Sequence, residues 1–258
     1  SSMTSLAVNL IPVKNLRQTP KKLLNRDSNI KLIKTAYGQP IVLAGLSLMP
    51  SIEICPSSKI AECFEICLKK SGFAAVYKAV NISRQQKTDY YLTQQDEFLA
   101  QLRRELFNLE KYATKHGKKA VVRLNVISDI AWEQHGIPQE FPNITMYDYT
   151  KRAARLGKTP DNYQLMFSYS AAAKYSTQVD MALKTNCPIT AVFKNGLPDI
   201  FLGRRVIDGD KSDLDNLKAF GKIVGLRVKG NEAKHSVSPF IVDTNLLDIN
   251  TGASQTAA

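Results

Sequence analysis

A series of short apolar runs in the second half of the chain constrains the fold more than any other feature of the sequence. Most are apolar through the middle and end in polar residues, and short helical pieces separate them. They are AVVRLNVIS (120–128), ITMYDYT (144–150), YQLMFSYS (163–170), ITAVFKN (189–195), RRVIDGD (204–210) and KIVGLRVKG (222–230). Nearly continuous apolar strands are typical of parallel sheets that are buried on both faces. With a first strand over residues 41–50, the pattern predicts an α/β fold with a mostly parallel, barrel-like sheet, irregular or partial rather than a closed eight-fold barrel.

Polar side chains gather where these runs end. Parallel α/β folds bind their ligands at the carboxyl ends of the strands, so the residues at those ends are predicted to hold a cofactor or ligand. The candidates are Asn125, Ser168, Asp208 and Lys229. The alternative is that these residues only form turns, as Asp, Asn and Ser do after many strands. Their recurrence over several strands favours a site.

The composition divides the chain into three parts. Residues 1–40 are basic, with Asp27 as their only acidic residue, and are predicted to form an N-terminal arm. Residues 41–245 are predicted to form a single α/β domain, and residues 246–258 a disordered polar tail. The chain carries a formal net charge of +12. A basic arm can bind the phosphates of nucleic acid, and the alternative is a solvated strap.

Two helices are predicted between the first strand and the later ones. Residues 73–91 have a helical pattern. The stretch Thr93–Lys115 is amphipathic, because its apolar residues recur at spacings of three and four. Thr93 and Asp96 are predicted to cap the start of this second helix, and His116-Gly117 to end it.

The cysteines indicate metal chemistry. Cys55, Cys63 and Cys67 have the spacing C-x7-C-x3-C and follow the first predicted strand. Cys63 and Cys67 share a helical face, and Cys55 returns from a Pro-Ser-Ser loop, so three thiolates can converge and leave one coordination position of a metal open. The pattern favours an iron–sulfur cluster. The alternatives are zinc with Cys187 or His135 as a fourth ligand, and buried thiols without metal.

A second group of candidates surrounds the end of the run at 120–128. Asp129 and Glu133 lie four residues apart and are predicted to act as acid and base, to bind a cation or to orient an amine. Alternatively, Asp129 caps a turn. Arg123 lies inside an apolar strand, and its guanidinium needs an acidic partner, either Asp148 or an acidic group of a ligand. Arg123, Asp129, Glu133 and Asp148 are therefore the candidate catalytic residues.

Further along, Asp210 or Asp213 is predicted to cap a helix over residues 211–219. The sequence has no P-loop, no G-x-G-x-x-G and no G-x-S-x-G motif. It also has no apolar run long enough for a membrane span and no signal peptide pattern, which predicts a cytoplasmic protein whose cysteines stay reduced.

Several strings occur in the order typical of one family. They are CPSSKIAECFEICLKKSG (55–72), RLNVISDIAWEQHGI (123–137), FPNITMYDYTKRAARLG (141–157), NYQLMFSYS (162–170), VIDGDKSD (206–213) and VGLRVKGN (224–231). Together they resemble the gene product 88-like proteins of tailed bacteriophages, over residues 40–245. The resemblance implies a phage protein that acts in the host cytoplasm, and it brings no established activity.

The layout is also similar, more distantly, to radical S-adenosylmethionine enzymes, in which a cysteine loop follows the first strand of a partial barrel. That resemblance implies a four-iron cluster whose open iron binds S-adenosylmethionine, although the spacing there is C-x3-C-x2-C. Two functions follow from the sequence. One is an iron–sulfur enzyme that acts on a nucleotide, a nucleic acid or a small metabolite. The other is a non-catalytic phage protein that binds nucleic acid or a host protein, with a structural zinc or no metal.

Overall fold

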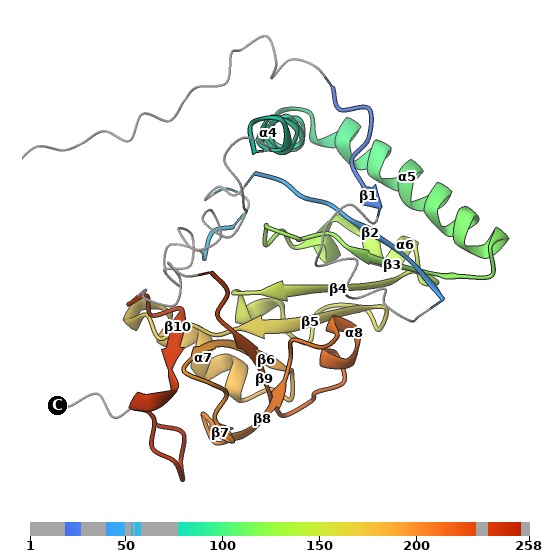
Figure 1. Ribbon diagram of the computed structural model, residues 1–258. Helices are drawn as coiled ribbons and strands as arrows, with labels where there is room; N and C mark the ends of the chain where they lie inside the picture. Colours follow the sequence, from blue (N-terminus) through green and yellow to red (C-terminus); the bar gives the residue numbers. More distant parts are fainter. Residues whose placement is uncertain are drawn as a thin grey trace, which may run out of the picture.

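The structure is a computed structural model of the chain (Figure 1). It describes residues 19–26, 40–49, 53, 55–57, 77–230 and 237–253. The predicted arm is therefore described only at residues 19–26 and 40, and the predicted tail only as far as residue 253.

Within the residues that the structure describes, a sheet of ten strands organises the fold. Its order is β1-β2-β3-β4-β5-β6-β9-β8-β7, and β10 pairs with β6. Neighbours from β2 to β8 along this order run parallel, whereas the edge strands β1 and β7 pair antiparallel. The bounds are β1 Asn25–Arg26, β2 Ile41–Gly45, β3 Lys119–Arg123, β4 Thr145–Thr150, β5 Tyr163–Ser168, β6 Ile189–Lys194, β7 Ile200–Phe201, β8 Arg204–Asp208, β9 Ile223–Arg227 and β10 Ile241–Asp243. The predicted α/β class and mostly parallel sheet are confirmed.

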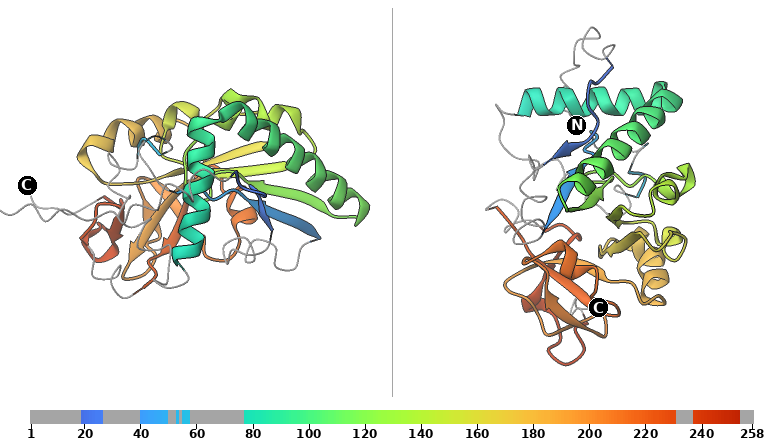
Figure 2. Two further views of the ribbon diagram at one scale, coloured as in Figure 1. Left: turned by 90° about the horizontal axis from the view of Figure 1, so that it is seen from above. Right: turned by 90° about the vertical axis from the view of Figure 1, so that its right-hand side faces the viewer.

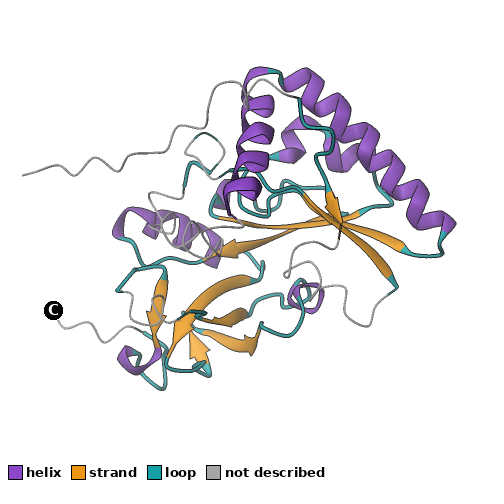
Figure 3. Ribbon diagram, turned by 45° about the horizontal axis from the view of Figure 1, so that its top comes forward, coloured by secondary structure: helices purple, strands orange, loops and turns teal. Residues whose placement is uncertain are grey.

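The sheet is open, so the barrel-like part of the prediction is not confirmed. In the described part of the chain, the edge strands β1 and β7 do not pair with each other. β7 instead turns back on β8 as a hairpin whose two turn residues, Leu202 and Gly203, have φ of 50° and 73°. Positive φ at both positions is typical of a type I′ turn. Figure 3 shows the sheet twisting from one end to the other, as parallel sheets do.

Helices and single turns connect the strands. They are α4 Tyr77–Thr93, α5 Gln95–Lys115, η1 Trp132–His135, α6 Ile137–Glu140, η2 Ala153–Arg155, η3 Ala173–Tyr175, α7 Ser176–Leu183, α8 Asp213–Asn216 and η4 Thr244–Leu246. The two predicted helices before β3 are therefore present, and His116 and Gly117 (φ 63°) do end α5. Figure 2 shows α4 and α5 crossing over the β2–β3 end of the sheet.

Two predicted caps are wrong. Thr93 belongs to the end of α4, where its hydroxyl donates to the Asp89 carbonyl (2.7 Å), and the N-cap of α5 is Gln94, which makes no side-chain capping bond. α8 is capped by Ser212, neither by Asp210 nor by Asp213, because Asp213 accepts hydrogen bonds from tyrosine side chains instead.

Alternation along the strands assigns residues to the two faces of the sheet. On one face, Val42, Ala44 and Val122 pack in the cluster that contains Phe98 and Leu102 of α5. The neighbouring residues of the same strands, such as Leu43 and Val121, point to the opposite face. There they pack in a cluster with Leu217, which follows α8, and the other members are Tyr147 and Met166. A further cluster joins β5 and β6 to α7. Both faces are covered near β3 and β4, which explains why these strands are apolar along most of their length.

Candidate functional site

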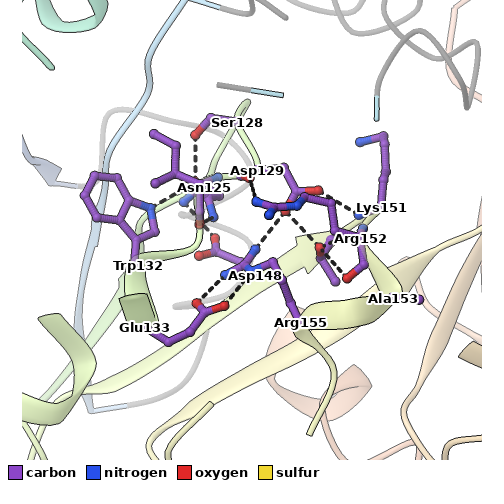
Figure 4. A network of polar contacts seen from close by, with 12 residues as sticks. Asn125, Ser128, Asp129, Trp132, Glu133, Asp148, Lys151, Arg152, Ala153 and Arg155 are labelled. Carbon is purple, nitrogen blue, oxygen red and sulfur yellow. Dashed lines mark hydrogen bonds and ion pairs between the residues drawn. The ribbon is translucent and has the colours of Figure 1, made fainter. Parts of the chain in front are cut away.

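A buried polar network lies at the carboxyl ends of β3 and β4, and Figure 4 shows its centre. We call it the carboxyl-edge network. Its members come from β3, β4, β5, the loop after β3, η1 and η2, and they are Arg123, Asn125, Asp129, Glu133, Asp148, Arg155 and Tyr163. Parallel α/β sheets bind their ligands at this edge.

Arg155 holds the two predicted carboxylates. Its Nε and Nη2 donate to Glu133 Oε1 and Oε2 (2.9 and 2.8 Å), and its Nη1 donates to Asp129 Oδ1 (2.7 Å). Burial lowers the pKa of Arg155, but the Glu133 hydrogen bond and the nearby Tyr163 and Asp129 outweigh it and raise the pKa above its usual value. Asp129 and Glu133 therefore bind the same cation, which is a side chain of the same protein.

Asp129 does not cap the following turn, so that alternative is wrong. The N-cap of η1 is Ala131, without a side-chain cap. The Asp129 carboxylate instead accepts from Thr150 Oγ1 (2.8 Å) and from the backbone N–H of Lys151 (2.9 Å). Both carboxylate oxygens are thus used to join the loop after β3 to the end of β4.

Asn125 shapes that loop. Its Oδ1 accepts from Ser128 Oγ (2.8 Å), the Ile130 N–H (3.0 Å) and Trp132 Nε1 (3.0 Å), and its Nδ2 donates to the Ile130 carbonyl (2.9 Å). Trp132 is fully buried and stacks on Phe98 of α5. The side chain of Asn125 is occupied by its own loop, which fixes the direction in which Asp129 and Glu133 point.

Asp148 lies fully buried on β4. Its Oδ2 accepts from the Tyr163 hydroxyl (2.6 Å) and its Oδ1 accepts from the Asn125 N–H (2.8 Å). Burial raises the pKa of Asp148 to about 7, although the Arg123 guanidinium and the Tyr163 hydroxyl favour the ionised form. The carboxyl group can therefore hold or release a proton near neutral pH.

Arg123 is the last residue of β3 and is the least satisfied member of the network. It forms an ion pair with Asp148, with 3.8 Å between Nε and Oδ1. Its guanidinium lies 4.7 Å from the centre of the Tyr149 ring. Nε is buried and has no hydrogen-bond partner among the described residues. Burial lowers the pKa of Arg123, but Tyr147, Tyr149, Asp213 and Asp148 raise it above its usual value, so the guanidinium remains charged.

Three predicted residues lie further along the sheet. Ser168 Oγ is 3.4 Å from Thr190 Oγ1, between β5 and β6. Asp208 pairs with Arg227 (3.0 Å) between β8 and β9, and Lys229 is exposed beyond β9. Within the described contacts, none of the three is joined to the carboxyl-edge network.

Cys55 is buried in the segment after the carboxyl end of β2. Cys63 and Cys67 lie outside the described residues, so their convergence with Cys55 stays a prediction. Cys187 precedes β6, at the opposite edge of the parallel strands, and its Sγ accepts from Thr185 Oγ1 (3.0 Å). His135 Nε2 is 2.9 Å from the Tyr91 hydroxyl. In the part of the chain that the structure describes, no three His, Cys, Asp or Glu side chains are grouped to hold a metal ion.

The described part of the basic arm is attached to the domain. Leu23 and Leu24 are buried, and their N–H groups donate to Glu105 of α5 (3.0 Å each). Asn25–Arg26 forms the edge strand β1. Residues 19–26 are thus a strap along the sheet and α5.

The family model for gene product 88 matches residues 17–242. The chain belongs to the gene product 88 family. The match confirms the phage family that the sequence strings resemble, and it begins before the strap rather than at residue 40. No curated protein and no solved structure matches the chain, so the resemblance to radical S-adenosylmethionine enzymes has no support from these comparisons. No helix within the described residues of this gene product 88 chain is long and apolar enough to span a membrane.

Sequence reasoning missed Arg155 and Tyr163, which connect the network. Arg155 lies in KRAARLG, where Arg152 is an equally good candidate, and nothing local shows which arginine is buried. One signal was available: if the carboxylates of Asp129 and Glu133 are buried, a cationic side chain must lie beside them. Tyr163 opens an apolar strand, where tyrosine more often packs than donates.

Proposed function

We propose that this gene product 88 protein is an enzyme that binds a small ligand at the carboxyl edge of its sheet, beside an iron–sulfur centre held by Cys55, Cys63 and Cys67. The observation that supports a ligand site is the Arg123–Asp148 pair, a buried charged pair without direct hydrogen bonds between its members. Buried polar groups in folded proteins are nearly always hydrogen-bonded, so such an exception indicates a functional position.

The neighbourhood of the cysteine segment supports the second half of the proposal. β2 lies beside β3, with Gly45 opposite Arg123, and the chain continues from there to the buried Cys55. The chain that leads to Cys55 therefore leaves the sheet at the edge where the network lies. Three cysteine ligands would leave one iron of a cluster open to a ligand such as S-adenosylmethionine, and zinc is the alternative metal.

The geometry divides the four candidate catalytic residues into two pairs. Asp129 and Glu133 are bound to Arg155, so we assign them to positioning the loop after β3. Asp148 can exchange a proton near neutral pH, because burial raises its pKa to about 7. Arg123 can still donate hydrogen bonds, because its Nε has no acceptor among the described residues. These two are the residues that we expect to contact a ligand.

The test is anaerobic purification followed by measurement of iron, zinc, and the visible charge-transfer absorbance of the protein. We expect a coloured protein whose absorbance and iron are lost in Cys63→Ser and retained in Cys187→Ser, the matched control at the opposite edge of the strands. A colourless protein without iron would refute the iron–sulfur proposal. One zinc per chain in that protein would favour the non-catalytic binding protein.

A further inference from the structure

We propose that Arg123, held in place by Tyr149 and Asp213, is an oxyanion subsite that binds the carboxylate or phosphate of a small ligand at the carboxyl edge of β3. The inference deepens the proposed function and rests on its ligand site, but not on the cysteine centre. A ligand bound at this edge of the sheet would therefore carry a carboxylate or a phosphate group.

The buried Arg155 and the half-buried Arg204 both have the close hydrogen-bond acceptors that Arg123 lacks. Arg155 uses Nε, Nη1 and Nη2 in hydrogen bonds to Glu133, Asp129 and Tyr163. Arg204 donates to the backbone carbonyls of Thr185 (2.7 Å), Cys187 (2.8 Å) and Leu183 (3.3 Å).

Arg123 is only 5% exposed, yet its contacts with described residues are one ion pair at 3.8 Å and one aromatic ring. A buried guanidinium with unused donors carries a desolvation cost that an acceptor would remove. An oxyanion fits this position best, because the planar fork of arginine binds carboxylate and phosphate oxygens in pairs.

The guanidinium is oriented before any ligand arrives. Tyr149 lies beneath it, and the Tyr149 hydroxyl donates to Asp213 Oδ1 (2.9 Å). The Tyr147 hydroxyl donates to Oδ2 of the same carboxylate (3.0 Å). Both hydroxyls are thereby tied to the start of α8, which fixes the ring under Arg123. Tyr149 is partly exposed, so this side of the guanidinium is close to the surface. A fixed donor binds more tightly because less rotamer freedom is lost.

Asp148 competes with the ligand for Arg123. The groups that face its carboxyl are the Arg123 guanidinium from β3, the Asn125 N–H from the following loop, the Tyr163 hydroxyl from β5 and, at longer range, Arg155 from η2. An oxyanion at Arg123 adds a like charge beside Asp148, which favours protonation of Asp148. Binding should therefore be accompanied by proton uptake and should strengthen as the pH falls through about 7.

The experiment follows the arginine Nε–H resonances of the full-length protein by ¹H–¹⁵N NMR, with Arg123 assigned from its loss in Arg123→Lys. Inorganic phosphate and acetate are titrated separately at constant ionic strength and at two pH values. We expect the Arg123 resonance to shift with at least one anion, with millimolar-order affinity typical of such small ions. Arg155 and Arg204 are internal controls and should not shift. In Arg123→Lys, the backbone amide resonances of β3 report binding in place of the lost Arg123 resonance, and the affinity should weaken roughly tenfold, since a charge remains but the fork is lost.

A shift with phosphate alone assigns a phosphorylated ligand, and a shift with acetate alone assigns a carboxylate. No shift of Arg123 with either anion, or equal shifts of all three arginines, overturns the subsite. Arg123→Lys should retain any iron, and Cys63→Ser should retain the Arg123 shift. Failure of this inference is therefore distinguishable from failure of the iron–sulfur proposal. Thermal unfolding of Arg123→Lys confirms that the variant is folded.

Discussion

Replacing Arg155 by methionine tests the physical account of the carboxyl-edge network. Methionine keeps an unbranched apolar stem and removes only the guanidinium. Arg155 and Glu133 have side-chain exposures of 2% and 6%, so little water can replace the lost cation. In the variant, Asp129 keeps its bonds from Thr150 and Lys151, whereas the Glu133 carboxylate has no other described partner.

The expected loss of stability follows from the Glu133 carboxylate, which stays buried without a partner in the variant. Removing one partner of a buried ion pair costs about 3–5 kcal/mol, because the other charge stays buried and unpaired. Domains of this kind are stable by about 5–15 kcal/mol, so Arg155→Met should lose a large part of the free energy of unfolding. Adding Glu133→Gln removes the stranded charge, and the double variant should be less unstable than Arg155→Met by about 1–3 kcal/mol.

Urea unfolding followed by circular dichroism measures these differences, provided that the transitions are two-state. Arg152→Met is the matched control. Its guanidinium makes one contact with the Asp129 carbonyl at 3.5 Å, and the change should cost no more than about 0.5 kcal/mol. A cost below about 1 kcal/mol for Arg155→Met, or single-variant costs that simply add, would show that the network is hydrated and that the reasoning is wrong.

Two further predictions concern the pH dependence of stability. Because the pKa of Asp148 in the folded protein is raised to about 7, the native state binds more protons than the unfolded chain between about pH 4 and 7. The free energy of unfolding should therefore fall as the pH rises through that range, by at most ~1.4 kcal/mol per pH unit. Asp148→Asn should flatten this slope when the free energy is measured by urea unfolding at each pH. Wild-type and variant slopes that coincide would contradict the burial argument. Lys87 is 2% exposed, and burial lowers its pKa to about 8. The free energy of unfolding should therefore rise between about pH 8 and 10.5, where the unfolded chain binds the proton and the native state does not. Lys87→Met should be at least as stable as wild type at pH 7 and should show no such increase. Destabilisation by Lys87→Met at pH 7 would show instead that the ammonium is paired.

The sequence alone determined the α/β class, the mostly parallel sheet and several of its strands. Period-two and continuous apolar runs at 120–128, 144–150 and 163–170 specify buried strands, because a residue's burial repeats with the period of its own element. The amphipathic pattern of Thr93–Lys115 specified α5 for the same reason. The predicted helix caps were wrong by one residue, because Gln94 and Ser212 are the N-caps in the structure. Sequence patterns do not define the ends of a helix to within a single residue.

The sequence also identified Asp129 and Glu133 as a pair of candidate carboxylates, but not the residue that they bind. Asp129 and Glu133 are close in sequence and meet at Arg155, and Arg123 and Asp148 meet because their strands are neighbours. Only the tertiary structure decided that Arg155 fills the gap between the two carboxylates and that Tyr163 reaches Asp148 from the next strand. Likewise, whether the sheet closes depends on the hairpin at Leu202-Gly203 and on strand twist summed over the sheet. The physical reason is the same in each case: local pattern fixes which way a side chain faces, whereas its partner is set by pairing between segments distant in sequence.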